Sequence, residues 1–221
     1  EMCIRDSMKW LNDAGRIPLL TPEEEIHYGR LVQARQAILS EFPVGPYTPE
    51  QQRTLRAGKR AEDRMVQGNL RLVSMVVKKA PKVLRSMTRE DLLNEGSIGL
   101  ILATQKFDPE RGYKFSTYAY WWIRQAVNRA IADKDRTIRL PANAHDDLLK
   151  LMKWMSKQKV VPTLEQCAQQ LGMSKETIRL YLSSAQDVRS LDSRCTTSDS
   201  QTSELIDFIE DPSVNLMASL E

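Results

Sequence analysis

Cysteine, histidine and glycine are scarce in this chain of 221 residues, which contains three, two and nine of them respectively. The cysteines, Cys3, Cys167 and Cys195, are odd in number and scattered, and the histidines, His27 and His145, are far apart. Neither a disulfide framework nor a zinc site fits this pattern, because both need cysteines or metal ligands at suitable spacings. We therefore expect no metal site and no cofactor.

The chain also lacks a long apolar run. No stretch approaches the roughly eighteen residues of a membrane span, and the first residues lack the charged and then apolar order of a secretory signal. No phosphate-binding loop and no nucleophile beside a base can be recognised. We expect a cytoplasmic protein that is not an enzyme and has no membrane partner.

Charge is abundant but unevenly distributed. Lysine and arginine number 32, aspartate and glutamate 29, and the formal net charge is +3. Residues 192–221 carry seven acidic side chains against Arg194 alone, a net charge of −6, which leaves +9 for residues 1–191. A basic body favours a polyanionic partner.

Apolar residues recur at spacings of three and four, the period of an α-helix, and we predict an all-α fold without strands. Thr21-Pro22-Glu23-Glu24 combines an N-cap, a proline in the first turn and a capping-box acid, and Thr88 with Asp91 marks another helix start. The predicted helices cover residues 22–40, 61–79, 88–107, 115–133 and 144–157, followed by a helix-turn-helix at 163–171 and 174–185.

Changes in composition divide the chain into three parts. The pattern changes after Arg139-Leu140-Pro141, and residues 193–203 are too polar to form a core. We expect a larger helical domain at 8–137, a small three-helix domain with the helix-turn-helix at 138–190, and a flexible acidic linker at 191–221.

Half of the fourteen aromatic residues lie between positions 107 and 122. On a helical wheel the segment 115–133 places small aliphatic residues on one face and aromatic and polar residues on nearly the opposite face. The first group is Ala119, Ile123, Ala126, Val127 and Ala130, and the second is Tyr118, Trp121, Trp122, Gln125, Asn128 and Arg129.

Aromatic residues at helical spacing usually belong to a core. Here the aliphatic face already supplies one, and Arg111, Lys114, Arg124 and Arg129 flank the outward rings, with no acid between 111 and 131. Exposed rings stack on unpaired bases for roughly 1–3 kcal/mol per base, while lysine and arginine hold the phosphates. The pattern therefore indicates a surface for single-stranded nucleic acid.

One long run resembles the promoter-melting signature of bacterial RNA polymerase sigma factors of the sigma-70 family. It reads Arg111-Gly112-Tyr113-Lys114-Phe115-Ser116-Thr117-Tyr118-Ala119-Tyr120-Trp121-Trp122-Ile123-Arg124-Gln125-Ala126. Support comes from Gly15-Arg16-Ile17-Pro18-Leu19-Leu20-Thr21, Asn69-Leu70-Arg71-Leu72-Val73, Asp91-Leu92-Leu93-Asn94-Glu95-Gly96-Ser97-Ile98-Gly99-Leu100 and Asp207-Phe208-Ile209-Glu210-Asp211. The resemblance extends over about residues 8–215 and fits a primary factor or a related alternative factor.

The resemblance implies that residues 8–137 bind core polymerase and open promoter DNA at the minus-ten element, holding its single-stranded non-template segment. Tyr118 would stack on the base that replaces a flipped adenine, and Trp121 with Trp122 would form a wedge at the upstream edge of the bubble. The other implied DNA-binding residues are Phe107, Arg111, Lys114 and Thr117 around the adenine, Asn69, Leu72 and Ser116 around the last, flipped thymine, and Gln125 and Asn128 at the first base pair. Arg129, on the same outward face, is also predicted to bind DNA.

Contacts with the polymerase follow from the same resemblance. Asp91, Asn94 and Glu95 would contact the clamp coiled coil. A finger with Asp207, Phe208, Glu210 and Asp211 would enter the active-site cleft. The family also admits an anti-sigma protein as a partner, and the chain ends where the family's minus-thirty-five-binding domain would begin.

Two other functions remain open from the residues alone. An autonomous helix-turn-helix regulator would bind duplex DNA tightly without polymerase, although Ser174–Arg179 offers few base-reading side chains. A general single-strand binder would show affinity that tolerates any sequence. Catalysis is the weakest alternative.

Overall fold

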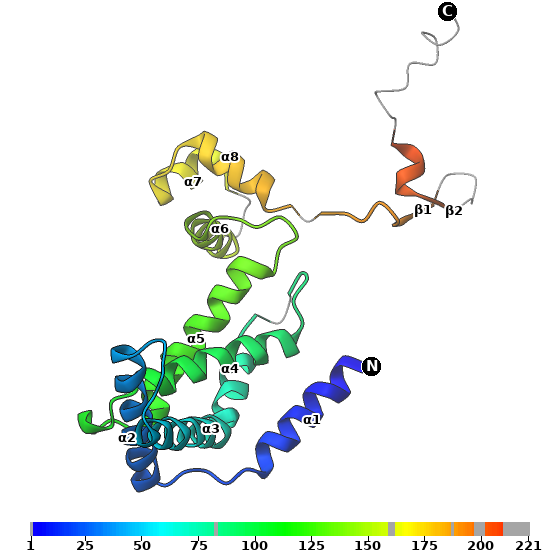
Figure 1. Cartoon of the computed structure of the whole chain (residues 1–221). Coiled ribbons are helices and arrows are strands. Elements are labelled where there is room, and N and C mark those ends of the chain that lie inside the picture. Colours follow the sequence, from blue (N-terminus) through cyan, green and yellow to red (C-terminus); the bar gives the residue numbers. More distant parts are fainter. Residues whose placement is uncertain (1, 82–83, 159–161, 187, 197–201, 210–221) are drawn as a thin grey trace, which may run out of the picture. The chain divides into compact units, whose positions relative to one another are not determined.

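The computed structural model describes residues 2–81, 84–158, 162–186, 188–196 and 202–209. The chain divides into two compact units, residues 1–145 and 146–221 (Figure 1). Within the described residues, none of the helices combines the length and the apolar character that crossing a membrane requires.

In the described residues of the first unit, five complete α-helices and a short 3-10 helix precede the start of α6 (Ala142–Met155). They are α1 (Met2–Arg16), α2 (Pro22–Glu41), α3 (Pro49–Lys78), α4 (Arg89–Lys106), η1 (Pro109–Arg111) and α5 (Phe115–Lys134). The predicted helices at 22–40, 88–107 and 115–133 are confirmed within one or two residues at each end. Both predicted capping boxes, at Thr21 and Thr88, are formed.

Two features of the first unit differ from the prediction. Helix α1 was not predicted, and α3 begins at Pro49 rather than near residue 61. The start of α3 has the same chemistry as that of α2, because Thr48 and Gln51 form a capping box and Pro49 occupies the first turn. The signal was therefore present in the sequence.

The core of the first unit lies between α3, α4 and α5, and its largest fully buried side chains include Met65, Leu92, Leu100, Phe115 and Ile123. Figure 1 shows α4 and α5 side by side. Two glycines of α4 allow this packing. A Cβ at Gly96 would lie 2.7 Å from Val73 Cγ1, and one at Gly99 would lie 2.7 Å from Ala126 Cβ. A larger residue at Gly96 would push against α3, and one at Gly99 would push against α5.

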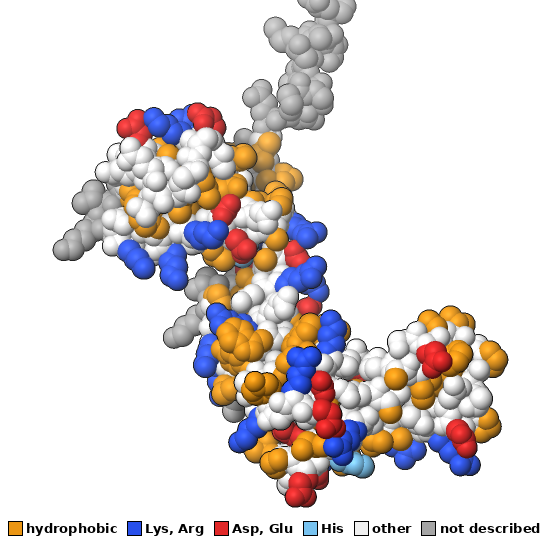
Figure 2. All heavy atoms as spheres, turned by 90° about the vertical axis from the view of Figure 1, so that its left-hand side faces the viewer, with side chains coloured by type: hydrophobic (Ala, Val, Ile, Leu, Met, Phe, Trp, Pro, Cys, Tyr) orange, Lys and Arg blue, Asp and Glu red, His pale blue; other side chains and the backbone are white. Residues whose placement is uncertain are grey.

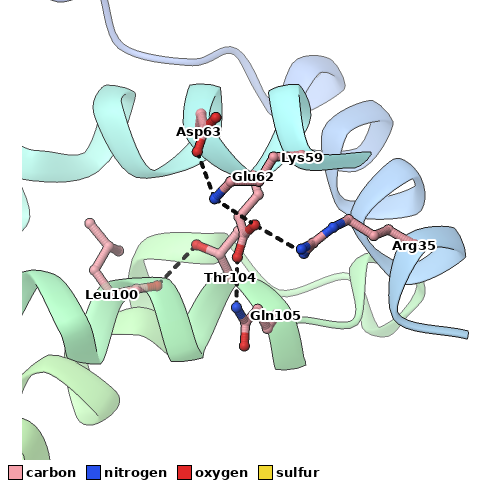
Figure 3. A network of polar contacts seen from close by, with 7 residues as sticks. All are labelled: Arg35, Lys59, Glu62, Asp63, Leu100, Thr104 and Gln105. Atoms are coloured by element: carbon pink, nitrogen blue, oxygen red, sulfur yellow. Dashed lines mark hydrogen bonds and ion pairs between the residues drawn. The ribbon is translucent and has the colours of Figure 1, made fainter. Parts of the chain in front are cut away.

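A buried carboxylate joins three of these helices (Figure 3). Glu62 on α3 is 1% exposed. It accepts from Arg35 Nη1 on α2 at 3.0 Å, from Lys59 Nζ at 3.2 Å and from Gln105 Nε2 on α4 at 2.7 Å. Because the charge is both paired and hydrogen-bonded, its burial is tolerated, and removing Arg35 would leave only the more exposed Lys59 as its cation.

The second unit contains a helix-turn-helix, as predicted. Helices α7 (Leu164–Leu171) and α8 (Lys175–Ser184) are joined at Gly172, whose φ of 65° is the left-handed conformation that glycine adopts readily. Helix α6 (Ala142–Met155) crosses the boundary between the units, and its Leu151 packs with Cys167 and Ile178 in a separate small core.

The predicted all-α fold is confirmed, because the described chain is mostly helical, but the expectation that it has no strands is wrong at one place. Strands β1 (Arg194–Thr196) and β2 (Thr202–Glu204) pair antiparallel, with Arg194 opposite Glu204, and η2 (Leu205–Phe208) follows. The described part of the predicted flexible linker is thus a short hairpin. A strand of three residues is too short to show an alternating apolar pattern in the sequence. The opposite charges of the facing residues Arg194 and Glu204 favour the pairing of the two strands.

Candidate nucleic-acid interface

Helix α5 buries the face that its sequence predicts. Ala119, Ile123, Val127 and Ala130 are buried, and Ala126 is half-buried. The opposite face is graded: Trp121, Gln125, Asn128 and Arg129 are exposed, whereas Tyr118 and Trp122 are half-buried against the core. In Figure 2 hydrophobic side chains lie between Lys and Arg side chains on one face of the first unit.

Four aromatic rings form a continuous series, called here the aromatic ladder: Phe115, Phe107, Tyr118 and Trp122. Phe107 packs edge-on against Phe115 at 5.1 Å between ring centroids, and the next two steps measure 6.0 and 6.1 Å. Phe115 and Phe107 are buried, and Tyr118 and Trp122, at the outer end of the series, are half-buried. The buried rings therefore hold the outer rings in place.

Lys106 contacts both outer rings of the aromatic ladder, one through its side chain and one through its backbone. Its Nζ lies 4.5 Å from the centroid of the Trp122 ring, and its carbonyl accepts a hydrogen bond from the Tyr118 hydroxyl at 3.3 Å. Sequence analysis did not single out Lys106, which is sixteen residues from Trp122. A cation over an aromatic face adds positive charge where a nucleic-acid strand would pass.

Trp121 belongs to a different group of rings from Trp122. It is 62% exposed. Its ring packs edge-on against Tyr120 at 5.6 Å, and the Arg124 guanidinium lies 5.8 Å from its centroid. The two tryptophans, predicted to act together as a wedge, thus have different ring partners and different exposure.

The loop before α5 contains three of the predicted adenine-pocket residues. Arg111 and Lys114 are exposed on either side of Gly112, whose φ is 73°. The Arg111 Nε donates to Asp108 Oδ2 at 3.2 Å. A hydrogen bond from the Glu110 backbone N–H, with a further contribution from Arg111, holds the pKa of Asp108 below its usual value. Phe107 forms the buried side of this loop, and the fourth predicted residue, Thr117, is exposed in the first turn of α5.

Helix α2 holds this loop from the other side. Gln33 Nε2 donates to the Phe107 carbonyl at 3.1 Å, Arg30 Nε donates to Glu110 Oε1 at 2.8 Å, and Glu25 Oε2 accepts from the Phe115 N–H at 3.2 Å. The last bond satisfies one of the free N–H groups at the start of α5. These three residues of α2, with loop partners 74 to 90 positions away, were not predicted.

Gly29 brings α2 close to the same loop. A Cβ at this position would lie 3.2 Å from Pro109 Cγ and 3.4 Å from Phe107 Cδ1. The backbone of α2 therefore packs directly against the side chains of the loop, and an added Cβ would require them to shift by a few tenths of an ångström.

The predicted thymine-pocket residues come from two helices. Asn69 on α3 is half-buried, and its Nδ2 donates to the Met65 carbonyl at 2.9 Å. Leu72 is half-buried against the core, and Ser116 on α5 is exposed. The amide oxygen of Asn69 can accept from other donors, and the amide nitrogen has a second hydrogen to donate.

A groove of about 320 Å³ runs between α4 and α5. Trp122, Gln125, Arg129 and Lys134 of α5 line this groove, together with Glu95 of α4. The predicted DNA-binding and polymerase-binding residues therefore border one depression.

The three predicted polymerase contacts on α4 differ in their surroundings. Asp91 accepts from the Thr88 N–H and hydroxyl, both at 2.8 Å, and these hydrogen bonds hold the pKa of its carboxyl below the usual value. Asn94 is exposed, and Glu95 forms an ion pair with Lys134 of α5. Asp91 therefore has a structural role as the acid of the capping box at the start of α4.

Two apolar side chains next to these acids were not predicted. Ile98 and Leu102, one helical turn apart on α4, are 51% and 41% exposed and line the same groove. Exposed apolar side chains beside acidic ones are typical of a protein-binding surface.

The predicted finger is described only in part. Asp207 Oδ2 accepts from the Glu204 N–H at 3.0 Å within η2, and Phe208 is exposed. Glu210 and Asp211 lie outside the described residues.

The chain is similar to three parts of one protein family. Residues 6–36 match Sigma-70 factor, region 1.2; residues 65–137 match Sigma-70 region 2; and residues 154–218 match Sigma-70 region 3. These ranges include most of α2, the aromatic ladder and the helix-turn-helix.

Individual relatives support the same similarity. The RNA polymerase sigma factor SigA4 of Synechococcus elongatus is 42% identical over 213 residues, which cover 94% of this chain and 67% of that protein. SigA1 of the same organism and SigA of a Nostoc species are each 40% identical, over 93% of this chain and 56% and 57% of their own lengths. The chain thus spans between just over half and two thirds of the length of these relatives.

Proposed function

Because the chain belongs to the sigma-70 family of RNA polymerase sigma factors, we propose that it binds core RNA polymerase and directs promoter recognition and opening at the minus-ten element. Residues 8–137 would perform both tasks, with the small domain at 138–190 and the acidic segment at 191–221 completing the contacts with the polymerase.

The observation that carries this proposal is the aromatic ladder with its surrounding cations. A half-buried ring supported by buried rings is rigid, so it loses little entropy when a base stacks on it. Lys106 lies over the Trp122 ring, Arg111 and Lys114 are exposed in the loop before α5, and all three would hold phosphates. A paired duplex does not expose the face of a base, and this arrangement therefore favours a strand that has already opened.

The proposed roles follow the position of each ring. Tyr118 would stack on a base, and Phe107, which is 4% exposed, would support that site from below. Arg111, Lys114 and Thr117 would surround the flipped adenine. Asn69, Leu72 and Ser116 would hold the flipped thymine, and Trp121, Trp122, Gln125, Asn128 and Arg129 would contact the upstream edge of the bubble.

On the polymerase side, Asn94 and Glu95 would contact the clamp coiled coil, with Ile98 and Leu102 adding apolar contact. Asp91 would act together with them from the first turn of α4. Asp207, Phe208, Glu210 and Asp211 would reach the active-site cleft. This division agrees with an acidic segment that avoids DNA and a basic body that binds it.

The test measures binding of single-stranded DNA by the complex of the full chain with core polymerase. We expect a strand with the sequence TATAAT, the usual element of the family, to bind more tightly than its scrambled version or its duplex. Tyr118→Ala should lose roughly 1–3 kcal/mol of this affinity, because a stacking ring is removed. Tyr118→Phe, which keeps the ring but loses the hydrogen bond to Lys106, should bind almost as the original chain does.

The contrary outcomes identify the competing functions. Equal affinity for the scrambled strand would indicate a general single-strand binder. Preference for the duplex without polymerase would indicate a helix-turn-helix regulator. Loss of binding in Tyr118→Phe equal to that in Tyr118→Ala would show that the hydroxyl, and not stacking, matters.

A further inference from the structure

The C-cap residue of α5 holds the segment of chain that leads into α4. This residue, Asp135, is only 8% exposed. Its Oδ1 atom accepts hydrogen bonds from three consecutive backbone N–H groups, at 2.8 Å from Arg85, 3.2 Å from Ser86 and 3.2 Å from Met87. We propose that Asp135 is a positioning residue for the polymerase-binding start of α4. The inference rests on the proposed function and adds a residue that no sequence pattern predicted.

The position of Asp135 is unfavourable for a carboxylate without strong partners. A helix C-terminus carries partial negative charge, which repels an anion, and burial removes the water that would otherwise solvate it. The three N–H groups supply the compensation, because hydrogen bonds to a charged acceptor are stronger than those between neutral groups. Moving the bound segment away from α5 would break all three hydrogen bonds at once.

Side chains of the same segment reinforce its attachment. Leu84 and Met87, at its two ends, pack against the core of the first unit. Ser86 Oγ donates to the Lys134 carbonyl at 3.4 Å. The next residue after Met87 is Thr88, the N-cap of α4. The place of this segment on the end of α5 therefore sets where α4 begins.

The end of α5 thus holds α4 at two places. Asp135 fixes the segment before the N-cap, and its neighbour Lys134 pairs with Glu95, seven residues after the N-cap and about 10 Å farther along the helix axis. Asp91 and Asn94, which are exposed, lie between these two attachments. Two attachments fix the direction of this part of α4, and a surface that is fixed in advance loses less entropy when it binds a partner.

The test measures the affinity of the full chain for core polymerase. Asp135→Ala removes the acceptor of the three N–H groups and should weaken polymerase binding several-fold. Asp135→Asn keeps an oxygen at the same place and should retain most of the affinity, although the charge is lost. With polymerase at saturation, the affinity for the TATAAT strand should stay nearly unchanged in both variants. The reason is that Asp135 lies seventeen residues after Tyr118, about 25 Å along the helix axis.

Two further measurements separate positioning from general stability. Val32→Ala truncates a buried side chain of α2, a helix that contacts the opposite end of α4 at Phe107. It should lower the thermal stability and leave the polymerase affinity of the folded chain unchanged. Amide hydrogen exchange at Ser86 and Met87 should become faster in Asp135→Ala and stay slow in Asp135→Asn.

A second variant applies if Asp135→Ala does not fold. Asp135→Glu keeps the charge but moves the carboxylate by one methylene group, which disturbs the geometry of the same three hydrogen bonds. It should weaken polymerase binding, and unchanged affinity would contradict the inference.

Other results would also overturn the inference. If Asp135→Ala binds polymerase as the original chain does while Glu95→Lys still weakens binding, the segment does not position the surface and the proposed function stands. Equal losses of affinity in Asp135→Ala and Val32→Ala would reduce the effect to general stability. An Asp135→Asn variant as weak as Asp135→Ala would assign the effect to charge and not to the held segment. Absence of polymerase binding by the original chain would instead remove the proposed function, and the inference with it.

Discussion

Glu95 on α4 and Lys134 on α5 form an ion pair, with 2.5 Å between Oε1 and Nζ. The carboxylate that we propose for polymerase binding is thus already neutralised by the helix that we propose for DNA binding. A charge reversal at Glu95 therefore changes two things at once, the surface offered to the polymerase and the packing of α4 on α5.

A charge swap separates these two effects. We expect Glu95→Lys to weaken polymerase binding markedly, and the double variant Glu95→Lys with Lys134→Glu to remain weak although the internal pair is restored. Because Lys134 is largely exposed, breaking the pair should change the free energy of unfolding by only about 0–1 kcal/mol. Pull-down of core polymerase and thermal unfolding measure the two quantities. Full recovery of polymerase binding in the double variant would assign Glu95 a purely internal role.

Gln33 is expected to matter for DNA binding although it lies on α2. Replacing it with alanine removes the donor to the Phe107 carbonyl, which should cost about 1 kcal/mol of stability and loosen the loop before α5. The affinity of the polymerase complex for the TATAAT strand should fall in parallel. Gln67→Ala, an exposed glutamine of α3, is the matched control. Reduced stability with unchanged DNA affinity would show that the loop geometry is not needed.

The Asp91 cap predicts a dependence of stability on pH. Hydrogen bonds from Thr88 lower the pKa of the folded carboxyl below its usual value of 3.8, so the carboxylate stabilises the fold above that pH. This contribution is lost as the pH falls through the lowered pKa. The difference in unfolding free energy between the original chain and Asp91→Asn should be constant near neutral pH and shrink below about pH 4. Urea unfolding at several pH values measures it, and a difference that grows on acidification would contradict the assignment.

The acidic finger can be tested without removing its hydrogen bonds. Asp207→Asn keeps an acceptor for the Glu204 N–H, and Glu210→Gln with Asp211→Asn removes the remaining charge of the segment. We expect the triple variant to alter initiation from short RNA primers, because negative charge no longer occupies the proposed path of the RNA, while polymerase affinity stays the same. Weaker binding of the polymerase would instead make the segment an anchoring contact.

Much of the secondary structure follows from groups that are close in sequence. The capping boxes at Thr21 and Thr88 need only residues three positions apart, and a wheel drawn from the sequence identifies the buried face of α5. The same local reasoning could have found Thr48 with Gln51, and it failed for β1 and β2 because three-residue strands carry too little periodic signal.

The sequence by itself determined the helices, the basic body and the aromatic residues of α5, since these depend on composition and on spacings of a few residues. Only the tertiary structure decided how the rings are held. Glu25 and Gln33 reach Phe115 and Phe107 across 90 and 74 residues, and Lys106 lies over Trp122 from another helix. Contacts at such separations arise from the packing of α2 and α4 around α5, which helical periodicity does not encode.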